Sequence, residues 1–247
     1  MSRLDLLQVG KRAVELAVQR GAHQAEAFVV DTRSTSVRMD RWELKRTRAV
    51  RDYGIGIRIY DTRGSMGYAY ATTFDTAAIE QAVTAALAQA KAGTPNPEFK
   101  SLPSPKLPTP VSDIYDEEVA ALTDQQIVAF VLQTADAARS VGPEVYSASI
   151  EAEVSETEVA IVNSLGVEAT TRSTFCDLAA EVTAKREGEM SSGFEFVSGR
   201  CLSVLDPSFV GRRAAEEAVR SLGAQKIETK RMPVILSPLA LFRIFGS

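Results

Sequence analysis

Alternating apolar and polar positions are clearest at residues 53–60, where an isoleucine or tyrosine recurs at every second position. This period of two predicts a strand with one buried face. The turn-forming run Asp-Thr-Arg-Gly at residues 61–64 leads into a second predicted strand at 65–71. Apolar residues then recur at helical spacing over residues 76–92. Together these patterns predict a hairpin covered by a helix.

The same reading extends toward the start of the chain. An apolar stripe at helical spacing between residues 4 and 18 ends at Gly21, which predicts a first helix. Residues 25–31 predict a strand. The charged segments 34–39 and 43–51 predict a hairpin of exposed edge strands.

Prolines concentrate in residues 94–112, which predicts a semi-rigid linker or a strap across a surface. Helical spacing resumes at Thr123 or Asp124 and ends before Gly142. The segments that follow predict an antiparallel meander and a closing helix. The predicted strands are 145–154, 157–162, 167–173 and 175–185, and the helix is 210–222.

We therefore predict an α+β fold. It has two successive units of helices packed on mainly antiparallel sheets, plus the truncated start of a C-terminal β-rich domain. The predicted boundaries are 1–93 for the N-terminal domain, 94–112 for the linker, 113–230 for the middle domain and 231–247 for the last. A buried-type strand at 232–238 marks that last domain. The two units repeat an order of elements rather than residues, so internal duplication stays an open alternative.

Composition narrows the classes of function. The 247 residues suffice for one large or two modest domains, and the net charge of −4 gives no basic field for nucleic acid. A basic cluster from Arg38 to Arg51 surrounds Trp42, but acidic residues interleave with it, so charged edge strands explain it better than a nucleic-acid surface. Two cysteines, no signal peptide and no long apolar run predict a cytoplasmic protein without a membrane segment.

Residues able to support catalysis are few. His23 is the only histidine and lies in a predicted turn, so neither a nucleophile triad nor a histidine zinc site is predicted. The glycines at 54 and 56 lack the third glycine and the helix of a dinucleotide-binding loop. Cys176 is predicted to be a core residue. The glutamates between 151 and 158 predict a solvated face rather than a metal site.

Several segments, in this order along the chain, resemble the TldD/PmbA family. They are AEAFVV at 25–30, YGIGIRIYDTRGSMGYAYATTFD at 53–75, NSLGVEATTRST at 163–174, GEMSSGFEF at 188–196, VGRRAAEEAV at 210–219 and MPVILSP at 232–238. No single segment is a catalytic signature. Their order gives the resemblance its specificity.

The resemblance implies a cytoplasmic protease that is homodimeric or has two subunits. In the TldD type, a HExxxH helix and a distant cysteine, both in a C-terminal domain, bind the catalytic zinc. This chain has no such motif and is similar to the PmbA type, which pairs with a zinc-bearing subunit. We therefore expect this chain to be the N-terminal part of a companion subunit of a metallopeptidase. It would form a homodimer or a heterodimer with a TldD-type zinc subunit and would help to enclose unfolded peptide.

No catalytic residue, metal ligand or cofactor is assigned to this chain, and zinc is expected only in a partner subunit. The candidates for peptide contact are Gly54, Gly56 and the segment from Ser191 through Ser192 and Gly193 to Phe194. Residues 187–200 fit either a mobile loop or a bent strand with glycine bulges. Two other classes of function stay open: a binding protein such as a gyrase modulator, which is the older family name, and a structural dimerisation module.

Overall fold

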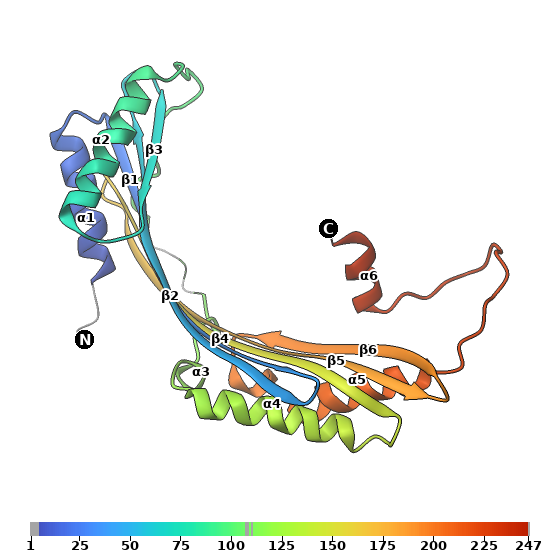
Figure 1. The fold of residues 1–247 in the computed structure, drawn as a ribbon. Helices are drawn as coiled ribbons and strands as arrows, with labels where there is room; N and C mark the ends of the chain where they lie inside the picture. Colours follow the sequence, from blue (N-terminus) through green and yellow to red (C-terminus); the bar gives the residue numbers. More distant parts are fainter. Residues whose placement is uncertain (1–4, 107–108, 110, 247) are drawn as a thin grey trace.

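The computed structural model describes residues 5–106, 109 and 111–246 (Figure 1). Leu4, Ser247 and residues 107, 108 and 110 of the predicted linker lie outside the described residues. The elements are α1 (Leu6–Gln19), β1 (Gln24–Asp40), β2 (Glu43–Tyr60), β3 (Met66–Ala71), α2 (Thr76–Ala92), α3 (Glu117–Ala120), α4 (Asp124–Arg139), β4 (Val145–Asn163), β5 (Glu168–Arg186), β6 (Glu189–Gly199), the 3-10 turn η1 (Leu202–Val204), α5 (Pro207–Arg220) and α6 (Pro238–Phe245).

All the described strands form one antiparallel sheet in the order β3-β2-β1-β4-β5-β6. The central pair, β1 and β4, stays in register from Glu26 opposite Asn163 to Asp40 opposite Ser149. The sheet is long and bent. The pair α1 and α2 lies against one end, and the pair α4 and α5 against the other (Figure 1). The predicted α+β class is confirmed.

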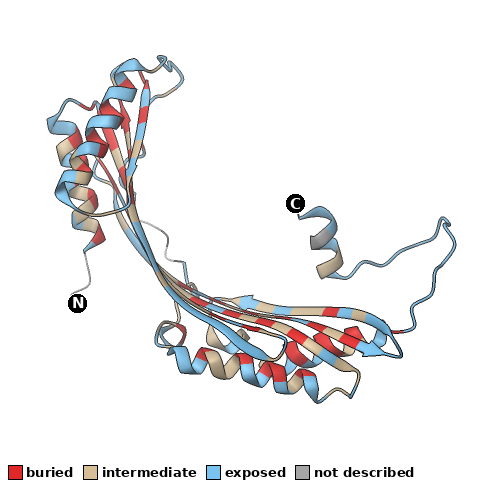
Figure 2. Cartoon of the chain, viewed as in Figure 1, coloured by how far each residue is buried: buried red, intermediate tan, exposed pale blue. Residues whose placement is uncertain are grey.

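Two hydrophobic cores form on the same face of this sheet. Val29 of β1 belongs to the core beneath α1 and α2, whereas Val37 and Met39 of the same strand belong to the core beneath α4 and α5. These residues lie an even number of positions apart, so their side chains point to one side. β4 likewise contributes Val162 to the first core and Ile150 to the second. Figure 2 shows buried residues gathered at the two ends of the sheet.

The strand breaks predicted near residues 32, 52, 155 and 174 do not exist, because β1, β2, β4 and β5 run through them. Between the two cores neither the α1–α2 pair nor the α4–α5 pair covers the sheet, so helix-facing positions become polar while the backbone stays extended. Asp31 and Arg33 of β1 stand opposite Glu158 and Glu156 of β4 there. We call this part of the sheet between the two cores the waist. The alternation of apolar and polar residues is lost there, so the sequence pattern predicted a break although the strands continue.

The two units repeat an order of elements. α1, β1, β2, β3 and α2 are followed by α4, β4, β5, β6 and α5, so each unit has three strands rather than the predicted four or five. The outer strands also correspond. A Cβ on Gly67 of β3 would lie 1.9 Å from the carbonyl oxygen of Ala86 in α2, and one on Gly193 of β6 would lie 2.2 Å from that of Ala214 in α5. Each edge strand thus uses a glycine to admit its covering helix.

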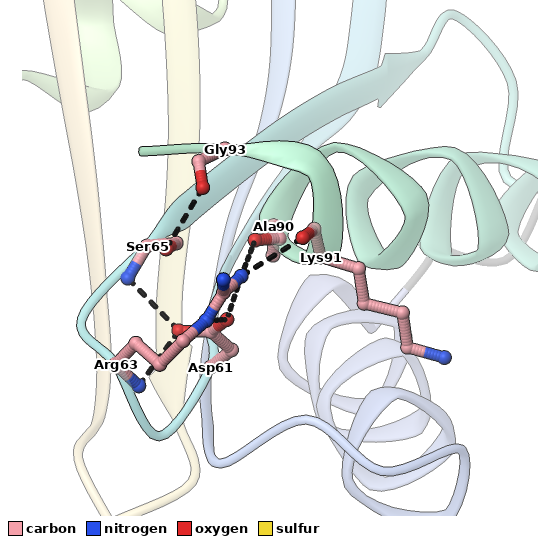
Figure 3. A network of polar contacts seen from close by, with 6 residues as sticks. All are labelled: Asp61, Arg63, Ser65, Ala90, Lys91 and Gly93. Carbon is pink, nitrogen blue, oxygen red and sulfur yellow. Dashed lines mark hydrogen bonds and ion pairs between the residues drawn. The ribbon is translucent and has the colours of Figure 1, made fainter. Parts of the chain in front are cut away.

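Polar contacts join the β2–β3 turn to the end of α2 (Figure 3). The Arg63 guanidinium donates to the carbonyl oxygen of Lys91 at 2.8 Å, and the Ser65 hydroxyl donates to that of Gly93 at 3.2 Å. The Asp61 carboxylate accepts hydrogen bonds from the backbone N–H groups of Arg63 and Ser65. Burial raises the pKa of Asp61, but these bonds and the Arg63 side chain outweigh it and hold the pKa below its ordinary value. The turn therefore caps the C-terminal end of α2.

The final segment differs from its prediction. Residues 232–237 form no strand, and the side chains of Val234 and Ile235 are 69% and 100% exposed. No described strand lies beside this segment to pair with it. The segment leads instead to α6 (Figure 1), whose first residues line a cavity with β6 and α5. Within the described residues, no helix combines the length and the apolar character needed to cross a membrane.

Candidate functional site

The face of the sheet opposite α1, α2, α4 and α5 is only partly covered. The proline-rich segment forms a strap across this face, at the end of the sheet that carries α1 and α2 on its other side. There the backbone N–H of Leu102 donates to the Gln24 side chain at 2.7 Å, and the Asn163 amide donates to the Pro103 carbonyl at 2.8 Å. Phe99 stacks on Tyr60 with ring centroids 3.7 Å apart. Of the two predicted roles for this segment, the strap is the one observed for its described residues.

Beside this strap the open face has a groove of about 520 Å³. Its walls are aromatic and aliphatic side chains from β1 and β3, and its base is the glycine pair of β2. The lining includes Phe28, Val30, Gly54, Gly56, Tyr68 and Tyr70. Phe28, Tyr68 and Tyr70 are 45%, 50% and 69% exposed and line the same groove, so they form a contiguous exposed patch. The groove can therefore accept an apolar group.

The glycines predicted for peptide contact, Gly54 and Gly56, both line this groove. Each also has a packing role. A Cβ on Gly56 would lie 2.7 Å from the Tyr68 hydroxyl oxygen, and one on Gly54 would lie 2.7 Å from the Ala71 carbonyl oxygen. The missing side chains let Tyr68 lie across β2 and let the backbone after β3 cross it closely.

The second predicted group, Ser191 to Phe194, lies in β6, so of the two interpretations of 187–200 the strand is the one observed. Gly193 faces α5, and Ser191 donates its hydroxyl proton to the Ala218 carbonyl oxygen. Phe194 lies 5.9 Å from the Phe196 ring, centroid to centroid. Ser192, Gly193 and Phe194 line a cavity of about 800 Å³ with residues of α5 and the start of α6.

The sheet order separates these two groups, because β2 lies next to the β3 edge and β6 forms the opposite edge. The structure therefore brings Gly54 and Gly56 together, and Ser191 to Phe194 together, but does not join the two sets. Sequence reasoning missed the aromatic side chains beside Gly54 and Gly56. Their signal was present, because Phe28, Tyr68 and Tyr70 occupy positions that alternate with the buried residues of their strands.

The described residues do not fit a zinc site. His23 is exposed in the turn between α1 and β1, where its backbone N–H donates to the Tyr60 carbonyl oxygen. Burial raises the pKa of the Cys176 thiol to about 11, so this cysteine stays protonated near neutral pH, whereas zinc binds the thiolate. Nowhere in the described ranges do three or more His, Cys, Asp or Glu side chains gather closely enough to hold a metal ion.

Comparison with known families gives two matches in chain order. Residues 25–90 match the family described as PmbA/TldA metallopeptidase domain 1, and residues 117–222 match the one described as PmbA/TldA metallopeptidase central domain. Among curated proteins, the chain is similar to the metalloprotease PmbA homolog of Haemophilus influenzae. The two are 27% identical over 233 residues, which cover 94% of this chain and 51% of that protein.

Solved structures share the fold. A Thermotoga maritima protein described as a modulator of a DNA gyrase aligns with a TM-score of 0.78 at 18% identity, over 90% of this chain and 49% of that one. A Bacteroides thetaiotaomicron protein described in the same way gives 0.80 at 20% identity, over 92% and 52%. TldE from Thermococcus kodakarensis gives 0.75 at 18% identity, over 85% and 47%. The chain spans about half the length of the relatives it matches.

Proposed function

Because this chain belongs to the PmbA/TldD family, we propose that it forms a peptide-enclosing part of a metallopeptidase assembly whose zinc is held outside the residues described. The observation that carries the proposal is the pair of family domains, matched in order and built on one shared sheet. Because the described side chains do not form a zinc site, the proposal places the catalytic step on residues other than these.

Under this proposal the chain binds and orients peptide and does not itself activate water. An unfolded peptide presents unpaired backbone groups and apolar side chains. The open face offers an aromatic groove for such side chains. No residue of this chain is assigned a catalytic role.

We propose further that the chain acts as the PmbA-like companion of a TldD-type subunit in the cytoplasm. The resemblance to the PmbA type, which usually lacks the zinc motif, supports this role, as does the similarity to the PmbA homolog of Haemophilus influenzae. The proposal requires a physical complex between the two proteins.

The experiment is affinity purification of the tagged chain from its own cells, followed by mass spectrometry, zinc analysis and a casein cleavage assay. We expect a TldD-type relative in near-equal amount, with bound zinc and cleavage that EDTA abolishes. Recovery of the chain with neither that relative nor zinc would count against the companion role.

Gyrase modulation is the rival function, and it rests on how two solved structures are described. We expect the purified chain to leave gyrase supercoiling unchanged. A dose-dependent inhibition would favour the binding-protein class instead.

A further inference from the structure

The outer edge of β2 is unpaired along much of its length. β3 pairs only with residues 55–60 of β2, and no other segment in the described part of the chain joins the ladder between Glu43 and Gly54. In an antiparallel strand, alternate residues direct their N–H and C=O groups away from the paired neighbour. This stretch therefore offers backbone donors and acceptors to another strand.

The geometry of this free edge is regular. Pairing between β1 and β2 runs without a register shift from Arg46 to Tyr60. The irregularity of this pair lies just before that stretch, where Lys45 of β2 has no partner between Leu44, opposite Met39, and Arg46, opposite Arg38. No proline occurs from Glu43 to Gly54, and no residue of that stretch has a positive φ. Bulges and prolines, the usual obstacles to strand addition, are thus absent from residues 46–54.

Basic side chains flank the free edge. Lys45 pairs with Glu43 at 2.5 Å, and Arg51 pairs with Asp31 at 2.7 Å. Arg46 and Arg48 are exposed, lie two positions apart on the open face, and make no ion pair with any residue that the structure describes. Acidic side chains at alternate positions of an added strand would stand beside these two arginines.

The charge pattern selects among occupants. Pairing of this edge with a second copy would place the basic run 45–51 against itself, which like-charge repulsion disfavours. A nucleic acid cannot pair with strand backbone. It would also meet Glu151 and Glu153, which stand on the same face opposite Arg38 and Ser36. An acidic polypeptide satisfies both the backbone groups and the arginines.

One end of the free edge opens into the aromatic groove. The groove is lined by Arg51, Asp52 and Tyr53 of the free edge and by Ala71 and Thr72 where β3 ends. A strand added beside residues 46–54 would therefore run toward the groove. A large apolar side chain at that end could enter it, next to Tyr70.

We propose that the β2 edge from Arg46 to Gly54 binds an extended acidic peptide by strand addition, with an apolar side chain in the adjoining groove. The inference rests on the proposed function in taking a peptide as the occupant. To that function it adds the binding site, the mode of binding and the charge of the bound peptide. It concerns binding by this chain alone and requires no cleavage, so it can fail or succeed independently of the metallopeptidase assignment.

The test is fluorescence anisotropy with the whole chain and a labelled peptide that alternates glutamate with valine and ends in phenylalanine. We expect saturable binding that weakens with added salt. The same peptide with N-methyl groups on alternate backbone amides should lose binding, because it cannot complete the ladder. A lysine-for-glutamate version should bind more weakly than the original.

The matched variants are Arg46→Glu/Arg48→Glu and the control Arg12→Glu/Arg212→Glu. Arg12 and Arg212 are exposed on α1 and α5 and give the same change in net charge. We expect the first variant to bind the acidic peptide about tenfold more weakly and the lysine peptide more tightly, while the control is unchanged. Circular dichroism establishes that both variants are folded.

Three results would overturn the proposal. The first is undiminished binding of the N-methylated peptide. The second is an equal loss of affinity for the acidic peptide in the control variant. The third is binding of single-stranded DNA that is as tight as that of the acidic peptide and that the Arg46→Glu/Arg48→Glu variant loses. Concentration-dependent self-association through the same two arginines, seen by sedimentation, would assign the edge to a second copy and also contradict it.

Discussion

At the residue scale, single positions determine how closely a helix approaches the sheet and whether a cysteine thiol ionises. Gly193 admits α5 to β6, and a Cβ there would also lie 2.5 Å from the backbone nitrogen of Ala218. Cys176 is fully buried in the second core. Both residues have structural explanations that require no ligand.

Replacing Gly193 should destabilise the fold. Gly193→Ala forces α5 away from β6, and we expect the free energy of unfolding to fall by about 2 kcal/mol or more. Urea denaturation measures this loss. Ser192→Ala is the control, because Ser192 is exposed and should tolerate the change within about 0.5 kcal/mol. Equal stability of the two variants would show that the helix does not rest on this glycine.

Cys176 should make stability depend on alkaline pH. Burial raises its folded-state pKa to about 11, whereas an unfolded cysteine titrates near about 8.5. The folded state keeps a proton that the unfolded state loses, so this contribution is full below the unfolded pKa and declines as pH rises toward 11. We expect the stability difference between the wild type and Cys176→Ala to shrink from about pH 8 to about pH 10. A difference that grows with pH would contradict the assignment.

At this scale the sequence predicted part of the candidate site. It marked Gly54, Gly56 and Gly193 as candidates for peptide contact, and Gly54 and Gly56 line the groove. It could not say what approaches each one. The partners come from other elements, such as Tyr68 across the hairpin or Ala214 in α5, and only the folded chain defines them.

At the element scale, helix caps and strand continuity show what local sequence decides. Thr123 and Gln126 form a reciprocal capping box at the start of α4, with the Thr123 N–H donating to Gln126 Oε1 at 2.9 Å. Asp75 precedes α2 and makes no capping bond of this kind. Both residues are of types that favour the N-cap position, and only the geometry separates them.

The two caps should differ in stability measurements. Thr123→Ala removes the hydroxyl that accepts the Gln126 N–H and should cost about 1 kcal/mol. Asp75→Ala removes no capping bond and should cost less than half as much. Thermal unfolding of both variants gives the comparison. A larger loss for Asp75→Ala would invert the expected order.

Strand continuity was beyond the local pattern for a physical reason. Alternation reports which face is buried, and at the waist neither helix pair covers β1 or β4 (Figure 2). The ladder continues there through backbone hydrogen bonds and ion pairs such as Arg172 with Glu156. The helices α1, α2, α4 and α5 and most strand cores followed from periodicity, whereas α3, α6 and the union of two predicted sheets into one did not.

At the scale of the whole molecule, the shared sheet couples two cores. β1 and β4 each enter both cores, so neither core can lose its sheet without disturbing the other. Trp42, the only tryptophan, reports on the second core. Its indole N–H donates to the Tyr146 carbonyl oxygen at 2.8 Å, and its ring lies 4.3 Å from the Arg139 guanidinium.

A substitution in the first core should therefore alter the Trp42 signal. Ile57→Ala empties a fully buried position under α1 and α2 and should lower the free energy of unfolding by about 2–5 kcal/mol. We expect the denaturant midpoint followed by Trp42 fluorescence to fall together with that followed by circular dichroism. Thr47→Ala, at an exposed position of the same strand, is the control. An unchanged Trp42 transition beside a separate early step would indicate two independent units.

The decisive measurement is zinc content and peptide cleavage by the purified chain alone, before and after addition of a TldD-type relative. If this chain is a peptide-enclosing companion, it will neither retain stoichiometric zinc nor cleave casein peptides alone, and EDTA-sensitive cleavage will arise only with the zinc-bearing relative. Tightly bound zinc and EDTA-sensitive cleavage by the chain alone would contradict this conclusion and would require a metal site among its own residues.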